Sequence, residues 1–393
     1  MVTAGIVSEF DPFHNGHKYL VEKTRENGAT HIMTVMSGSF LQRGECAVLG
    51  KYPRAKAAVL GGVDLVLELP QIYACSSAQR FASGAVNTLA ACGCVDRLSF
   101  GSECGDKNAL MRAADTLSRL DVSEYTSQGF SYPRAAQAAA EKSGDVDIVP
   151  IFSSPNDTLA AEYIRAAKGR LNIFAVKRTA PHNGGSEGVF ISAMAIRRMM
   201  MQNDNTYLKY IPESTADIIS QETKNGGCPA ALENNERGVL TVLRRMTAED
   251  FAKLPDVSEG LENRITRAVR ENDTLESNIS AVKCKRYTRA RICRVIACAY
   301  LGITAEMPDM PPQYIRVLAF NDKGAEVLKA MKKTARLPIL TVARDFGSLN
   351  DSAAKMLAAD IRATELFGLC TPTLQGCGTD HYTGAIYIDK QGG

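Results

Sequence analysis

Several features are absent from this sequence, and each absence excludes a class of protein. Tryptophan does not occur, and aromatic residues make up only 7% of the 393 residues. No apolar run approaches the ~18 residues of a membrane-spanning helix. The N-terminus reaches Glu9 without a basic region ahead of it, so we expect no signal peptide. The net charge is only +3, which excludes a protein that is basic over its whole surface.

The 11 cysteines include no C-x-x-C pair. Cys92 and Cys94 are too close together for the usual zinc knuckle, and no second pair could complete one. We therefore expect no metal site built by the protein. In a chain of this length such thiols are typical of small buried apolar groups in a reducing compartment, so we expect a cytoplasmic protein with no membrane association.

The first two hundred residues alternate between short apolar runs and helical segments. Expected strands lie at 4–7, 31–36, 64–69, 97–100 and 172–176, and expected helices at 17–26, 54–60, 78–91 and 191–201. Residues 106–170 are expected to be mostly helical, and 182–188 to be a glycine-rich loop. This alternation predicts βαβ units and a parallel sheet, whose ligands bind at the carboxyl ends of the strands.

The alternation stops after about Asn205. Helices are expected at 239–245, 261–270 and 287–301, and strand and helix signals mix at 312–368. We therefore predict an α/β fold in two parts. Residues 1–204 would form the parallel-sheet domain, and residues 205–393 a mostly helical α+β region with a small mixed segment near 312–368.

The sharpest motif is FDPFHNGH at residues 10–17, directly after the first expected strand. His14 and His17 are three residues apart at the start of a helix, so both rings can project from one face. Gly16 allows close backbone approach, and the N–H groups of a helix start favour an anion. The motif predicts that two imidazoles stabilise a phosphate and its leaving pyrophosphate. Half of a metal site, or a simple helix cap, is the alternative.

This strand–loop–helix resembles the HxGH nucleotidyltransferases, a Rossmann-like superfamily that cleaves ATP between its α- and β-phosphates. The second signature of that superfamily resembles I-S-S/A-T-x-x-R, and ISAMAIR at residues 191–197 occupies its place. The resemblance implies that Arg197 and the helix start at Ser192 grip the β- and γ-phosphates. Met194 stands where the usual threonine would donate a hydroxyl.

Further motifs narrow the resemblance. MSGSFLQRGE at 36–45, DLVLELP at 64–70, FGSE at 100–103 and KRYT at 285–288 are together similar to the bacterial tRNA(Met) cytidine acetate ligase family. The likeness runs from residue 5 to about residue 369, although that family would have asparagine at Asp11 and proline at Cys46.

This resemblance implies a two-step reaction. Acetate attacks the α-phosphate of ATP, which gives acetyl-adenylate and pyrophosphate. The amine of the wobble cytidine in elongator tRNA(Met) then takes the acetyl group, which gives N4-acetylcytidine and AMP. Mg²⁺ is expected because ATP phosphates usually carry it.

The resemblance also implies the residues of the ATP site. His14 and His17 would be catalytic, and residues 7–20 would wrap the nucleotide. Asn156 could instead be a helix N-cap, and Arg178 a solvated charge. Gln42 and Arg43 could either touch substrate or lie on the surface. The expected ATP-binding residues are Val7, Ser8, Glu9, Phe10, Asp11, Pro12, Phe13, His14, Asn15, Gly16, His17, Lys18, Tyr19, Leu20, Gly101, Asn156, Arg178, Ser192 and Arg197.

Residues 283–294 contain six basic residues and no acid. On one helix, several of them would fall roughly on one side, which is typical of phosphate-backbone binding. A solvated face is the alternative, and Arg244 and Arg245 would extend the patch. The expected tRNA-binding residues are Lys283, Lys285, Arg286, Arg289, Arg291 and Arg294.

The residues alone leave two other functions open. One is a nucleotidyltransferase that moves AMP or CMP onto a small phosphate and releases pyrophosphate. The other is a non-enzymatic RNA-binding or scaffold protein that has kept a nucleotide fold. The long basic helical half argues against the first, and the intact His14, Gly16, His17 and Arg197 argue against the second.

Overall fold

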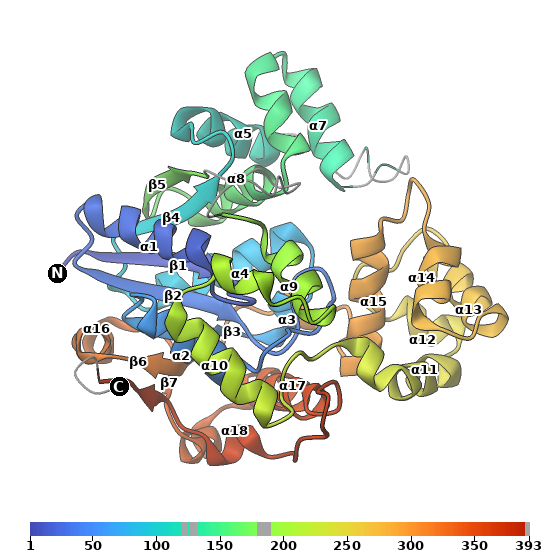
Figure 1. The fold of residues 1–393 in the computed structure, drawn as a ribbon. Helices are drawn as coiled ribbons and strands as arrows, with labels where there is room; N and C mark the ends of the chain where they lie inside the picture. The colour runs from blue at the N-terminus through green and yellow to red at the C-terminus, as the bar shows by residue number, and fades with distance from the viewer. Residues whose placement is uncertain (120–124, 126–129, 131, 179–189, 390–393) are drawn as a thin grey trace.

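One mostly parallel sheet lies at the centre of the molecule (Figure 1). The computed structural model describes all residues except 120–124, 126–129, 131, 179–189 and 390–393. The strand order is β5-β4-β1-β2-β3-β6-β7, with β8 paired to β6. The strands are β1 Thr3–Ser8, β2 His31–Ser37, β3 Leu65–Leu69, β4 Arg97–Ser102, β5 Asn172–Lys177, β6 Ile315–Phe320, β7 Ile339–Leu340 and β8 Ile386–Tyr387.

Helices cover both faces of the sheet, as expected of βαβ units. Successive residues of β1 point to opposite faces, so Ile6 packs in one apolar core and Val7 in the other. The core around Ile6 includes residues of α1 Asn15–Glu26, α2 Lys51–Leu60, α9 Ala193–Met201 and α10 Glu213–Lys224. The core around Val7 includes residues of α3 Gln71–Ala74, α4 Ala78–Ala91, α5 Lys107–Arg119, α7 Tyr132–Ser143 and α8 Pro155–Ala167.

The predicted α/β class is confirmed. The five strands expected before residue 177 all form, and β1 to β5 pair in parallel. The helix expected at 78–91 has those bounds. Among the described residues of 106–170, Pro133 lies in the first turn of α7 and Pro150 lies inside the 3₁₀ helix Val146–Ser153. The predicted loop at 182–188 lies outside the described residues.

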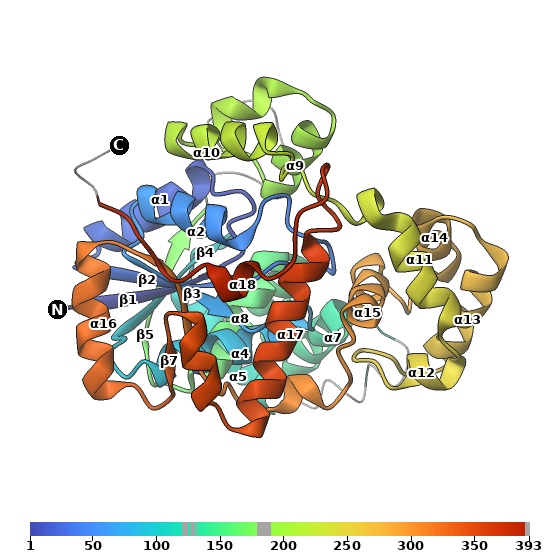
Figure 2. The same cartoon turned by 90° about the horizontal axis from the view of Figure 1, so that it is seen from below.

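A second group of helices stands to one side of the sheet (Figures 1 and 2). This helical group comprises α11 Glu236–Arg245, α12 Ala248–Ala252, α13 Leu261–Glu271, α14 Leu275–Val282 and α15 Arg289–Leu301. Its buried residues join the apolar core that contains Val7. None of the helices in the described part of the chain is long and apolar enough to cross a membrane.

The strands near 312–368 do not form a sheet of their own. β6 pairs antiparallel with β3, the last strand of the parallel part of the sheet, so that Leu65 lies opposite Phe320. α16 Asp322–Thr334, α17 Asp351–Phe367 and α18 Thr379–Tyr382 accompany these strands. The division into 1–204 and 205–393 stays a prediction, but the sheet draws strands from both sides of that boundary.

Buried charges hold the late segment against the early one. The ammonium of Lys51 lies 2.8 Å from Glu68 and 2.9 Å from Asp380. Arg316 of β6 lies 3.3 Å from Glu68 and 3.0 Å from Asp380. All four side chains are at most 4% exposed. Each charge therefore faces opposite charges, which offsets its desolvation.

Candidate functional site

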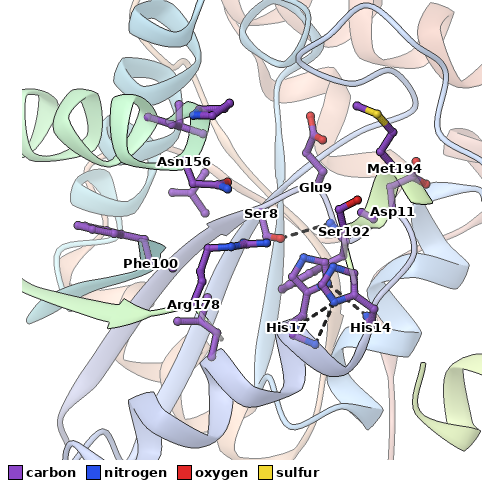
Figure 3. Close-up of a pocket in the computed structure, with 18 of the residues that line it drawn as sticks. Ser8, Glu9, Asp11, His14, His17, Phe100, Asn156, Arg178, Ser192 and Met194 are labelled. Carbon is purple, nitrogen blue, oxygen red and sulfur yellow. Dashed lines mark hydrogen bonds between the residues drawn. The ribbon is translucent and has the colours of Figure 1, made fainter. Parts of the chain in front are cut away.

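A pocket opens at the carboxyl ends of β1, β4 and β5 (Figure 3). Its walls come from the loop after β1, the start of α1, the loop after β2, the start of α8 and the start of α9. Of the expected ATP-binding residues, the pocket is lined by Val7, Ser8, Glu9, Phe10, Asp11, His14, Gly16, His17, Tyr19, Leu20, Gly101, Asn156, Arg178, Ser192 and Arg197. The structure therefore brings together residues separated by almost two hundred positions.

His14 and His17 stack at the N-terminus of α1, with ring centroids 3.7 Å apart. His14 is the N-cap of this helix, and its Nδ1 accepts the N–H groups of Gly16 (3.0 Å) and His17 (3.3 Å). The backbone N–H of His14 donates to Nδ1 of His17 in return (3.3 Å). A Cβ at Gly16 would lie 2.8 Å from the His14 ring, so this arrangement needs glycine.

These contacts fix the protons of both histidines. Each Nδ1 accepts a backbone hydrogen bond, so the proton of each neutral ring is on Nε2. Burial lowers the pKa of His14 to about 3, helped by the nearby cations Arg178 and Arg197. Burial, His14 and Arg178 hold the pKa of His17 well below its usual range. Both rings are therefore neutral donors at neutral pH.

Arg197 projects from α9 toward the same corner. Ser192 caps this helix through the N–H of Ala195. The Arg197 guanidinium lies 3.0 Å from the Glu45 carboxylate and 3.7 Å from Oδ2 of Asp11. Met194 also lines the pocket and is exposed, but its thioether cannot donate the hydrogen bond of a threonine.

Asp11 is 1% exposed and accepts the N–H of Val48 at 3.0 Å. Burial raises the pKa of Asp11 to about 6, although the cations Arg197 and Arg54 oppose this. The folded chain thus binds a proton that the unfolded chain loses near pH 3.8. Asp11 therefore contributes to stability at low pH, and that contribution disappears as the pH rises to about 6.

The Asp11→Asn variant is expected to remove this pH dependence. The free energy of unfolding of the variant minus that of the wild type should increase by up to about 3 kcal/mol as the pH rises from 4 to 7. Urea unfolding of both proteins at the two pH values measures this. A difference that stays constant with pH would contradict the assignment.

Asn156 and Arg178 face the other side of the pocket. The side-chain N–H of Asn156 donates to Glu103 Oε1, and Nε of Arg178 lies 3.8 Å from the same oxygen. Ser154, and not Asn156, is the N-cap residue of α8, so the capping interpretation of Asn156 is wrong. A Cβ at Gly101 would touch the Arg178 stem at 3.4 Å.

Four of the expected ATP-binding residues do not line the pocket: Pro12, Phe13, Asn15 and Lys18. Phe13 is fully buried and packs against Phe10, with the two ring centroids 5.0 Å apart. The Asn15 amide donates to the carbonyl of Lys209, and Lys18 is exposed. A continuous segment cannot face one ligand with every residue, because the side chains of the loop before α1 and of α1 itself point in different directions.

Some residues that the sequence prediction did not assign to the site line the pocket or support the backbone next to it. Gln42 and Arg43, left open between site and surface, line the pocket. Arg54 is fully buried, and its guanidinium donates to the carbonyls of Glu9, Ser37, Gly38 and Leu49. Nothing in the local sequence distinguishes Arg54 from a solvated helix residue. Glu45 could have been suspected from its place in the QRGE motif.

The basic run at 283–294 is not one helix face. Thr288 caps α15 by accepting the N–H of Arg291, so the helix begins at Arg289 and the earlier basic residues precede it. Acids from other segments pair with three of the arginines: Arg286 with Glu259 at 3.7 Å, Arg289 with Glu276 at 2.6 Å, and Arg294 with Asp256 at 2.7 Å. Arg291 donates to the carbonyl of Asp256 at 2.8 Å. Lys283 and Lys285 are exposed.

The parallel sheet, the paired histidines after its first strand and the arginine on α9 define a nucleotidyltransferase of the HIGH class. In agreement, the family model described as HIGH Nucleotidyl Transferase matches residues 1–380. A curated tRNA(Met) cytidine acetate ligase from Alkaliphilus metalliredigens is 35% identical over 395 residues, or 93% of each chain. Another of that name, from Syntrophomonas wolfei, is 34% identical and covers 98% of this chain and 99% of its own.

Solved structures agree with the sequence comparisons. The crystal structure of Thermotoga maritima TmcAL bound with alpha-thio ATP superposes with a TM-score of 0.92 at 33% identity, and covers 99% of this chain and 100% of its own. The apo form of the same protein gives a TM-score of 0.93, with the same identity and coverage. The chain belongs to the tRNA(Met) cytidine acetate ligase family.

Proposed function

We propose that this protein is an ATP-dependent acetate ligase that modifies tRNA(Met). It forms acetyl-adenylate from acetate and ATP, and then transfers the acetyl group to the wobble cytidine to give N4-acetylcytidine. The observation that carries this proposal is the pocket itself, where two neutral imidazole donors and two guanidinium groups converge at the strand ends. The full-length match to a relative bound with alpha-thio ATP supports ATP as the nucleotide.

The first step would depend on charge stabilisation and positioning. The Nε2–H groups of His14 and His17 donate to the phosphates, and Arg197 binds the β- and γ-phosphates. Arg178 lies across the pocket and balances the charge near the α-phosphate. The protein needs no nucleophile of its own, because AMP carries the activated acyl group.

Mg²⁺ would enter with the triphosphate. Within the described part of the chain, no cluster of three or more His, Cys, Asp or Glu side chains could hold a metal ion. Magnesium commonly binds through substrate phosphates with few protein ligands. The ion would then supply further neutralisation of the pyrophosphate as it leaves.

The second step would use the basic run at 283–294 to hold the tRNA backbone. The run adjoins the pocket, because the loop that contains Gly44 lines the pocket and packs closely on α15. A Cβ added at Gly44 would lie only 2.3 Å from the backbone N of Arg294. Residues 1–204 would thus supply the ATP and acetate site, and residues 205–393 most of the tRNA-binding surface. A tRNA substrate implies that the protein acts in the cytoplasm.

Incubation of the protein with ATP and labelled acetate, with and without tRNA, tests the proposal. We expect acetate-dependent exchange of pyrophosphate into ATP without tRNA, and labelled N4-acetylcytidine with tRNA(Met). A small-metabolite nucleotidyltransferase would show no dependence on acetate. A binding protein would show no turnover at all.

Removing charge from the basic run is expected to separate the two steps. The Arg286→Ala, Arg289→Ala double variant should weaken tRNA binding. The slope of the logarithm of the binding constant against the logarithm of the salt concentration should become less steep by about two. Acetate-dependent pyrophosphate exchange should not change, because neither residue lines the pocket. Binding isotherms at several salt concentrations, alongside the exchange assay, check this.

A charge-matched control is available on α16, at the opposite end of the molecule from α15 (Figure 1). Lys323 and Lys329 are exposed there, and the Lys323→Ala, Lys329→Ala double variant removes the same charge. It should bind tRNA as the wild type does. Equal losses of binding in the two double variants would show that only the net charge matters.

A further inference from the structure

The acetyl-transfer step requires a proton acceptor that the phosphate chemistry does not supply. The cytidine amine shares its lone pair with the ring and is therefore a poor nucleophile. When its nitrogen bonds to the acetyl carbon it becomes positively charged, and it must lose a proton before the product is stable. A carboxylate within hydrogen-bond reach of that nitrogen would accelerate this loss.

Most titratable groups of the pocket cannot take this proton. The Nδ1 atoms of His14 and His17 already accept backbone N–H groups, and each Nε2 carries the proton. Asp11 is 1% exposed and accepts the N–H of Val48. Glu45 is held by Arg197 at 3.0 Å. Each of these groups is thus engaged or shielded.

Glu9 differs from all of them. It follows β1 directly, and its carboxylate points away from the histidine rings in Figure 3. Its side chain accepts the backbone N–H of Gln42 at 2.7 Å, and no ion pair of Glu9 occurs in the described part of the chain. The carboxylate is therefore oriented by a backbone group and still presents an acceptor oxygen to the pocket.

The charged and titratable groups around Glu9 come from several elements. Arg54 of α2 and Arg197 of α9 are the cations that interact with its charge, and Asp11 is the nearby acid. Tyr163 of α8 and Cys75 also face it, and burial raises the pKa of both well above their usual ranges. Glu9 therefore has two cations and one acid as its charged neighbours.

The position of Glu9 also suits a base that enters from the RNA side. The carboxylate accepts a hydrogen bond from a turn at residues 41–44. This turn is closed by the hydrogen bond from the N–H of Gly44 to the carbonyl of Leu41 (2.9 Å). The Gln42 side chain ties this turn to the carbonyl of Ser76 at 3.0 Å. Gly44, with a φ of +79°, packs on the first turns of α15. A nucleotide held by the basic run therefore reaches the pocket beside Glu9.

We propose that Glu9 is the general base of acetyl transfer. It accepts one N4 proton of the cytidine as the bond between nitrogen and acetyl carbon forms. The bond between acetyl carbon and phosphate oxygen breaks, its electron pair stays on that oxygen, and AMP leaves. The proton on Glu9 then passes to water. This assignment rests on the proposed acetate ligase function.

The Glu9→Gln variant tests the assignment. Glutamine keeps an oxygen for the Gln42 N–H but cannot accept the proton. Acetyl transfer to tRNA should fall by at least about 100-fold. Acetate-dependent pyrophosphate exchange, and trapping of acetyl-adenylate by hydroxylamine as acetohydroxamate, should fall far less than transfer. Glu9 is only one of many residues that line the ATP pocket, and hydroxylamine needs no base from the protein. tRNA binding should be unchanged.

Glu45→Gln is the matched control, since Glu45 is a second pocket carboxylate, paired with Arg197. Any effect of this variant should fall equally on exchange and transfer. Transfer at the wild-type rate by Glu9→Gln would overturn the assignment, as would an equal loss of exchange and transfer. A wild type without acetate-dependent exchange and without N4-acetylcytidine would instead refute the proposed function.

Discussion

Replacing His14 with alanine is expected to lower acetate-dependent pyrophosphate exchange by about 100- to 1,000-fold, which is the usual cost of removing one donor to developing negative charge. The neutral ring presents Nε2–H to the phosphates, and alanine has no donor to put in its place. His17 would also lose the stacked partner 3.7 Å away that helps to fix its ring. Exchange of labelled pyrophosphate into ATP measures the loss.

His14 also caps α1, so a loss of activity in His14→Ala could reflect a frayed helix. Alanine at an N-cap costs about 1 kcal/mol, whereas asparagine is among the best caps. His14→Asn should therefore unfold at the wild-type temperature and still lose exchange to the same extent as His14→Ala. Full activity in His14→Asn would show that capping, and not donation to phosphate, is what His14 contributes.

Much of the catalytic half was predictable because its signals are local. A short apolar run predicts a buried parallel strand. The two histidines at the start of α1 are held by the capping contacts of His14, all of which lie within the motif. Periodicity then fixes which elements form, and the carboxyl-end rule places the motifs on one edge of the sheet. These signals do not depend on distant partners.

What could not be predicted depends on contacts between distant segments. The pairing of β6 with β3 joins residues about 250 positions apart, and nothing in either strand specifies that partner. The basic run looked unneutralised because its acids, Asp256, Glu259 and Glu276, come from other segments. The role of Arg54 likewise depends on four carbonyls brought together only by the fold.

The buried charges between α2, β3, β6 and α18 should dominate the stability of the sheet's late strands. Glu68 lies between Lys51 at 2.8 Å and Arg316 at 3.3 Å, and is 2% exposed. Glu68→Ala leaves two buried cations with Asp380 as their shared carboxylate. Removing one member of a buried ion cluster costs about 3–5 kcal/mol, so we expect that loss in the free energy of unfolding.

Urea unfolding measures the effect, with Arg267→Ala as the control. Arg267 and Glu271 form a pair whose side chains are 78% and 58% exposed, so its loss should cost less than about 1 kcal/mol. β6 and β8 depend on these buried charges, whereas β1 does not. In Glu68→Ala, moderate urea should therefore unfold β6 and β8 before β1. Hydrogen exchange would then show lost protection in β6 and β8 before β1, whereas simultaneous loss would mean that the whole sheet unfolds as one unit.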